Sequence, residues 1–114
     1  MPRRQTTIIP FPRARTTGLV ISAEDHAFLV RIIGPFYGSE VEDLLAAAST
    51  VPDGRRLSTR HPAMEQVLNA IGTEVHGFLK LEDEEAGRPR LKPKRGGTAE
   101  HLLALYRQIE SHLS

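Results

Sequence analysis

The chain has 114 residues, a formal net charge of +1 and a hydrophobic content of 39%. This length suits one domain with a small core, and the absence of cysteine excludes disulfide scaffolds, thiolate zinc sites and cysteine nucleophiles. The longest apolar run, Leu44–Ala48, is too short for a membrane span or the core of a signal peptide. We therefore expect a soluble, cytoplasmic protein with no membrane partner.

Charge is distributed unevenly along the chain. Residues 1–17, 55–61 and 88–97 carry basic but no acidic side chains, whereas acidic residues predominate in the periodic segments between them. Residues 1–17 also lack hydrophobic periodicity and contain three prolines, which predicts a flexible basic arm. Basic loops on an acidic body are typical of proteins that contact phosphate groups, although each loop alone is also explained by solvation.

Two short helices are predicted in the first half of the chain. Ser22 is a good N-cap for the first helix, which Gly34 and the following proline should end. Ser39 and Glu42 have the spacing of a capping box, which predicts the start of the second helix.

A third helix is expected to begin at Pro62, and its apolar stripe keeps helical spacing as far as Leu81. Gly77 favours a stop, followed by a strand over residues 78–82 and a return strand over residues 88–94. The alternative is one continuous helix to about residue 81, with no β-hairpin after it.

A final helix is predicted after Thr98, with one apolar face that fits either the core or a seam between two subunits. We favour the seam, because a helix that follows a hairpin often lacks another place to bury its apolar face. The predicted dimerisation residues are Leu102, Leu105, Tyr106, Ile109 and Leu113.

The predicted fold is therefore mainly α with a small β-hairpin. It consists of the arm (1–17), a winged helix-turn-helix domain (18–97) and a C-terminal dimerisation helix (98–114). In that layout the third helix enters a major groove of DNA, and the hairpin contacts the flanking backbone.

Four segments carry a resemblance to a known family: Ile33–Val41, Val51–Gly54, His61-Pro62 and Glu82–Arg90. In this order they resemble the PadR-like winged-helix transcription regulators. The resemblance implies a dimeric DNA-binding repressor whose C-terminal helix pairs the subunits. The chain departs from the family in lacking the aromatic strand usual after Gly-Arg-Pro-Arg. Residues 55–60 also look like an insertion before the recognition helix.

Basic and hydroxyl side chains near the predicted third helix and wing are the candidate DNA contacts. Arginine forks match phosphate oxygens and guanine edges, and hydroxyls at a helix N-terminus can meet a phosphate. The candidates are Arg55, Arg56, Ser58, Thr59, Arg60 and His61 before the helix, and Arg88, Arg90, Lys92, Lys94 and Arg95 in the wing.

No catalytic or metal-binding pattern is present in the sequence. The five histidines lack the spacing of metal ligands, and neither a phosphate-binding loop nor a nucleophile elbow occurs. We therefore expect neither catalysis nor a cofactor. The first hypothesis is a homodimeric regulator that binds double-stranded DNA. The second is a winged-helix-derived protein-interaction module or inhibitor that does not bind DNA.

Overall fold

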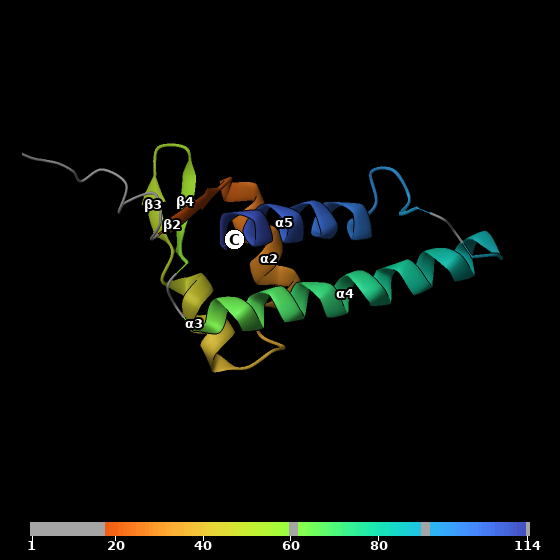
Figure 1. Cartoon of the computed structure of the whole chain (residues 1–114), viewed down its shortest axis with the longest axis horizontal. Coiled ribbons are helices and arrows are strands. Elements are labelled where there is room, and N and C mark those ends of the chain that lie inside the picture. Colours follow the sequence, from red (N-terminus) through yellow and green to blue (C-terminus); the bar gives the residue numbers. More distant parts are fainter. Residues whose placement is uncertain (1–17, 60–61, 90–91, 114) are drawn as a thin grey trace, which may run out of the picture.

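The computed structural model describes residues 18–59, 62–89 and 92–113. These residues form four helices and one small antiparallel sheet, so the expectation of a mainly helical chain with a small β-element is confirmed. In chain order the elements are β2 (Gly18–Ile21), α2 (Ala23–Ile33), α3 (Ser39–Ala46), β3 (Ser49–Val51), β4 (Gly54–Ser58), α4 (Ala63–Ala86) and α5 (Thr98–Leu113). The sheet, α2 and α3 lie toward the start of the long helix α4, and α5 packs along α4 (Figure 1).

The sheet has β4 in its centre, antiparallel to both β2 and β3. Leu19 on β2 is paired with Leu57 on β4, and both side chains are buried. The turn between β3 and β4 ends at Gly54, whose φ of +144° is unfavourable for other residues. A Cβ atom at this position would lie 2.1 Å from the carbonyl oxygen of Ile21, so the sheet requires glycine here.

The start of α2 agrees with the sequence prediction, whereas the start of α3 does not. The Ser22 hydroxyl accepts a hydrogen bond from the backbone N–H of Asp25 at 3.0 Å, as expected of an N-cap. At α3 the N-cap is Gly38, and no side chain caps the helix. The predicted capping box at Ser39 is therefore wrong, because this serine is already the first helical residue.

The predicted strand over residues 78–82 is wrong, and so is the hairpin over residues 78–94. Residues 78–86 belong to α4, which ends where Gly87 adopts a left-handed φ of +71°. The alternative of one continuous helix beyond residue 77 is confirmed. Gly77 does not interrupt it, because nothing lies within 4 Å of a Cβ built there and glycine in a helix costs only about 1 kcal/mol.

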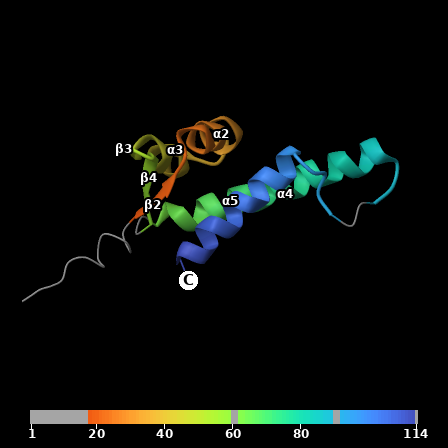
Figure 2. The ribbon, with the colours of Figure 1, turned by 90° about the horizontal axis from the view of Figure 1, so that it is seen from above.

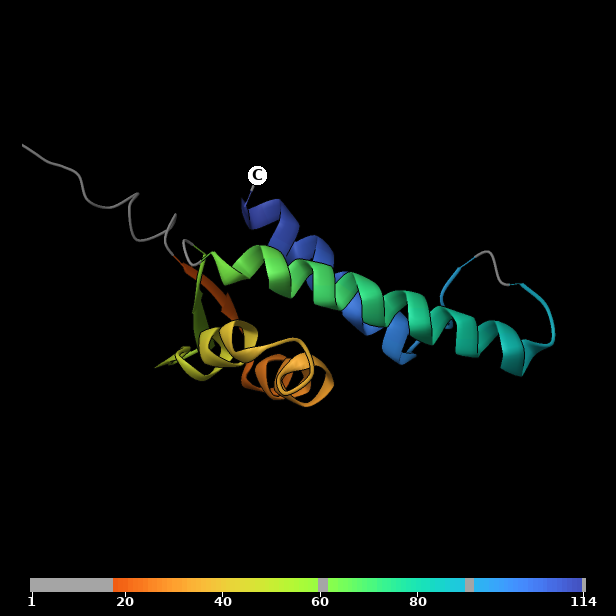
Figure 3. The ribbon, with the colours of Figure 1, turned by 90° about the horizontal axis from the view of Figure 1, so that it is seen from below.

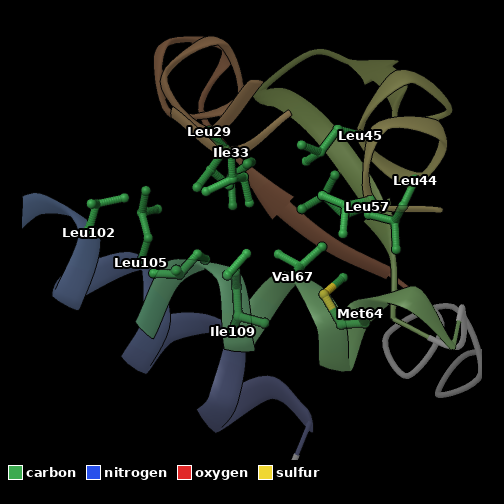
Figure 4. Close-up of a cluster of buried hydrophobic side chains, with 14 of the residues drawn as sticks. Leu29, Ile33, Leu44, Leu45, Leu57, Met64, Val67, Leu102, Leu105 and Ile109 are labelled. Carbon is green, nitrogen blue, oxygen red and sulfur yellow. The ribbon is translucent and has the colours of Figure 1, made fainter. Parts of the chain in front are cut away.

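One hydrophobic core joins the sheet, α2 and α3 to the helical pair α4 and α5. The close-up in Figure 4 shows apolar side chains from all these parts gathered together. Its fully buried members include Leu29, Ile33, Leu45, Leu57, Met64, Ile71, Leu102, Leu105 and Ile109. The apolar face of α5 is thus covered by other elements of the same chain.

Two polar contacts add to this core at its edges. The hydroxyl of Tyr37, in the turn between α2 and α3, donates a hydrogen bond of 2.5 Å to the Glu74 carboxylate on α4. On α5, Nε2 of His101 lies 2.7 Å from a carboxylate oxygen of Asp25, and its ring stacks on Phe28 with centroids 4.1 Å apart. Both contacts tie the helical pair to the first half of the chain. In the described parts of the chain, no helix is long and apolar enough to cross a membrane.

Candidate nucleic-acid interface

The structure separates the two basic segments that the sequence analysis combined into one DNA-binding surface. Residues 55–59 precede α4, whereas residues 88–89 and 92–95 follow it, at the far end of this helix from the sheet (Figure 2, Figure 3). A helix of 24 residues is about 36 Å long, about three times the width of a major groove. The two segments therefore cannot contact one groove as a helix and its adjacent wing. Arg60, His61 and Arg90 lie outside the described residues.

Near the sheet, the predicted contacts lie on or directly after β4, which is the central strand of the three-stranded sheet. Arg55 is half-buried and donates a hydrogen bond to the carbonyl oxygen of Gly54. Arg56 is exposed, and its methylene groups cover Gly18. Ser58 is exposed and Thr59 is half-buried. Only part of this set is therefore available to a ligand.

The neighbouring helix α3 weakens the case for DNA contact at this end. Its exposed side chains include Glu40, Glu42 and Asp43, and the helix carries no basic residue. Carboxylates facing a phosphate backbone are repelled by it.

A hollow lies between α5 and the loop that joins α4 to α5, and we call it the tip cavity. It has a volume of about 990 Å³. Its walls are formed by Arg88, Pro89, Lys92, Pro93 and Arg95 from the loop and by Glu100, Leu103, Ala104 and Arg107 from α5. The cavity thus combines four cationic side chains, four apolar residues and one carboxylate.

Hydrogen bonds to two glutamates hold the described part of this loop in place. Glu82, which is only 8% exposed, accepts a bond of 2.8 Å from the backbone N–H of Lys94. Glu100 accepts a bond of 2.8 Å from the backbone N–H of Gly96. At Gly97 a Cβ atom would lie 2.9 Å from a carboxylate oxygen of Glu82, so glycine lets the loop approach α4 closely. These contacts position the loop residues that line the cavity.

Among the described residues, the cations of the tip cavity have no acidic partner within ion-pairing distance. Within residues 18–59, 62–89 and 92–113, none of the side chains of Arg88, Lys92, Arg95 and Arg107 forms an ion pair. Like charges in a concave wall raise the local potential, which attracts anions. Guanidinium groups also bind phosphate oxygens through two parallel hydrogen bonds. The cavity is therefore suited to bind phosphate groups.

The sequence analysis identified three of these four cations and missed Arg107. Arg88, Lys92 and Arg95 were predicted on a wing, and the structure places them on the loop between two helices. Lys94 is exposed on the same loop but does not line the cavity. Arg107 lies on α5, and no sequence signal connects it with the loop unless α4 is known to continue to Ala86.

Three of the five residues predicted to form a dimer seam are buried within the chain. Leu102 and Ile109 are fully buried, and Leu105 is 2% exposed. Tyr106 is half-buried, and Leu113 is 40% exposed. The apolar stripe of α5 therefore serves the core, and the homodimer stays a prediction.

The described residues contain no group of three or more His, Cys, Asp or Glu side chains that could hold a metal ion. Comparison of the chain with protein-family models, curated proteins and solved structures gives no match. The resemblance to PadR-like regulators stays a prediction from the sequence.

Proposed function

We propose that this protein is a non-enzymatic DNA-binding regulator whose affinity comes from phosphate contacts at the tip cavity. The observation that carries the proposal is the convergence of Arg88, Lys92, Arg95 and Arg107 on one concave surface without ion pairs to other described residues. Contacts of this kind bind the backbone and release its counterions, and they do not depend on base sequence.

The order of elements supports a winged-helix relationship, but the elements in the places of the recognition helix and the wing are not the expected ones. A strand, two helices and a hairpin follow one another in the order β2-α2-α3-β3-β4. The second strand of the hairpin, β4, pairs with β2. This is the order of a winged helix from its first strand onward. In it, α3 stands in the place of the recognition helix and β3–β4 in the place of the wing. Because α3 is acidic, we assign the main DNA affinity to the tip cavity.

The proposal is tested by the affinity of the full chain for fluorescently labelled DNA of mixed sequence at low salt. We expect R88Q/R107Q to weaken binding by on the order of tenfold or more, because charge-assisted hydrogen bonds to phosphate are worth about 1.5–3 kcal/mol each. The control K80Q removes a charge from an exposed position of α4 outside the cavity and should change the affinity by less than about twofold.

Two results would overturn the assignment. Wild-type protein that binds no DNA at low salt would exclude the function itself. A loss of affinity in R55Q/R56Q but not in R88Q/R107Q would move the DNA contact to the β3–β4 hairpin.

A second candidate function is a protein-interaction module that does not bind DNA. It is favoured by the exposed carboxylates of α3 together with Phe36, whose side chain is 71% exposed in the turn before this helix. An aromatic side chain beside charged groups is typical of a protein contact. Co-purification of one protein from nuclease-treated lysate, lost in F36A, together with no DNA binding, would support this function.

A further inference from the structure

We infer that the tip cavity accepts single-stranded nucleic acid in preference to duplex, an inference that rests on the function proposed above. The shape of the cavity, its apolar lining and the position of its one carboxylate all favour a single strand.

The shape favours a strand that can enter the cavity. A volume of about 990 Å³ is at the upper end of the roughly 300–1,000 Å³ typical of sites that enclose small molecules. A duplex is a stiff rod whose phosphates lie on its outer surface and whose bases are paired inside. It can touch the rim of such a hollow with its phosphates, but its bases cannot enter. A single strand can place a whole nucleotide inside.

The lining also suits a nucleotide whose base is exposed. Pro89 and Pro93 on the loop and Leu103 and Ala104 on α5 form an apolar surface beside the cations. A phosphate gains nothing from this surface, whereas an unpaired base can bury its flat face there. Arginine side chains bind both parts of a nucleotide, because the guanidinium plane stacks on bases and its N–H groups donate to phosphates.

Glu100 interacts differently with the base and with the phosphate of a nucleotide. One of its oxygens accepts the N–H of Gly96 at 2.8 Å, which keeps the carboxylate at the cavity wall. A carboxylate repels a phosphate but accepts hydrogen bonds from the exocyclic amino groups of bases. It therefore favours a base beside Glu100 and a phosphate beside the cations.

The test compares a labelled single-stranded oligonucleotide of mixed sequence with the duplex of the same sequence, using the full chain at low salt. We expect the single strand to bind on the order of tenfold more tightly, since stacking is worth about 1–3 kcal/mol per base. The variant A104E places a carboxylate on the exposed apolar wall and should weaken single-strand binding by a similar factor. The control A27E makes the same change at an exposed position of α2 and should have less than about a twofold effect.

The outcomes separate this inference from the proposed function. Duplex binding as tight as single-strand binding, or an A104E variant with unchanged single-strand affinity, would overturn the inference. If binding to either form is then still lost in R88Q/R107Q, the proposed function stands. If the wild-type protein binds neither the single strand nor the duplex, both the inference and the proposed function are wrong.

Discussion

At the scale of single residues, the two serines at predicted helix starts have different roles. The Ser22 hydroxyl caps α2, whereas Ser39 lies within α3 and has no capping bond. We expect S22A to lower the free energy of unfolding by about 1 kcal/mol and S39A to lower it by no more than about 0.5 kcal/mol. Urea denaturation of both variants measures this difference, and equal losses would contradict the assignment of the cap.

Tyr37 gives the structure a predictable response to alkaline pH. Burial raises the pKa of Tyr37 to about 12, and the hydrogen bond to Glu74 and the charge of this carboxylate act in the same direction. The unfolded chain releases this proton near pH 10, so between about pH 10 and 12 the folded state binds more protons and stability falls as pH rises.

The matched measurement is the free energy of unfolding of wild type and Y37F across this range. The phenylalanine variant has no proton to lose at this position, so its stability should fall less steeply between about pH 10 and 12. Parallel curves for the two proteins would show that Tyr37 is not held in its neutral form by the fold.

At the scale of elements, α4 shows what hydrophobic periodicity predicts and where a local signal misleads. The helical spacing of apolar residues continues past Gly77, and this alternative is confirmed. The predicted strand at residues 78–82 rests on Gly77 as a helix breaker. Phe78 and Leu79 pack against the hydrophobic core, and this tertiary contact outweighs the low helix propensity of one glycine.

Glycines in α4 and in the hairpin should therefore respond oppositely to alanine. In G77A the new methyl group enters open space in a helix, and we expect a gain of about 0.5–1 kcal/mol in the free energy of unfolding. In G54A it would meet the backbone of Ile21 at a positive φ, and we expect a loss of more than about 1 kcal/mol. Thermal or urea unfolding measures both, and a destabilising G77A would contradict a continuous α4.

The observed hairpin was not predictable from alternation. β3 has three residues, and β4 contains the pair Arg55-Arg56. The only strong sequence signal of this hairpin is the turn before Gly54. Strand β2, which pairs with β4, is more than 30 residues away in the sequence. Pairing at such a distance depends on tertiary packing, which short windows of sequence do not contain.

At the scale of the whole molecule, the buried face of α5 decides how stability depends on concentration. Ile109 packs in the core of its own chain, so I109A should lower the free energy of unfolding by about 2–5 kcal/mol. The difference in unfolding midpoint between this variant and wild type should be the same at low and high protein concentration, because the lost contacts lie within one chain. Midpoints that rise with concentration would show that subunit association stabilises the fold.

The candidate site was only partly predictable for a related reason. The basic composition of residues 88–97 indicated phosphate binding, and three of these side chains do line the tip cavity. Their position in one cavity with Arg107 and the anchoring of the loop through Glu82 depend on the length of α4 and on the way α5 returns along it. The length of α4 also determines how far apart the two basic segments lie.

The salt dependence of nucleic-acid affinity tests the central claim most directly. If Arg88, Arg95 and Arg107 each neutralise a phosphate of a single strand, a plot of log K against log salt should be shallower by about 2 for R88Q/R95Q/R107Q than for wild type, since each phosphate contributes about 0.7 to the slope. K80Q should keep the wild-type slope. Equal slopes for wild type and the triple variant would show that the cations of the tip cavity do not contact phosphates.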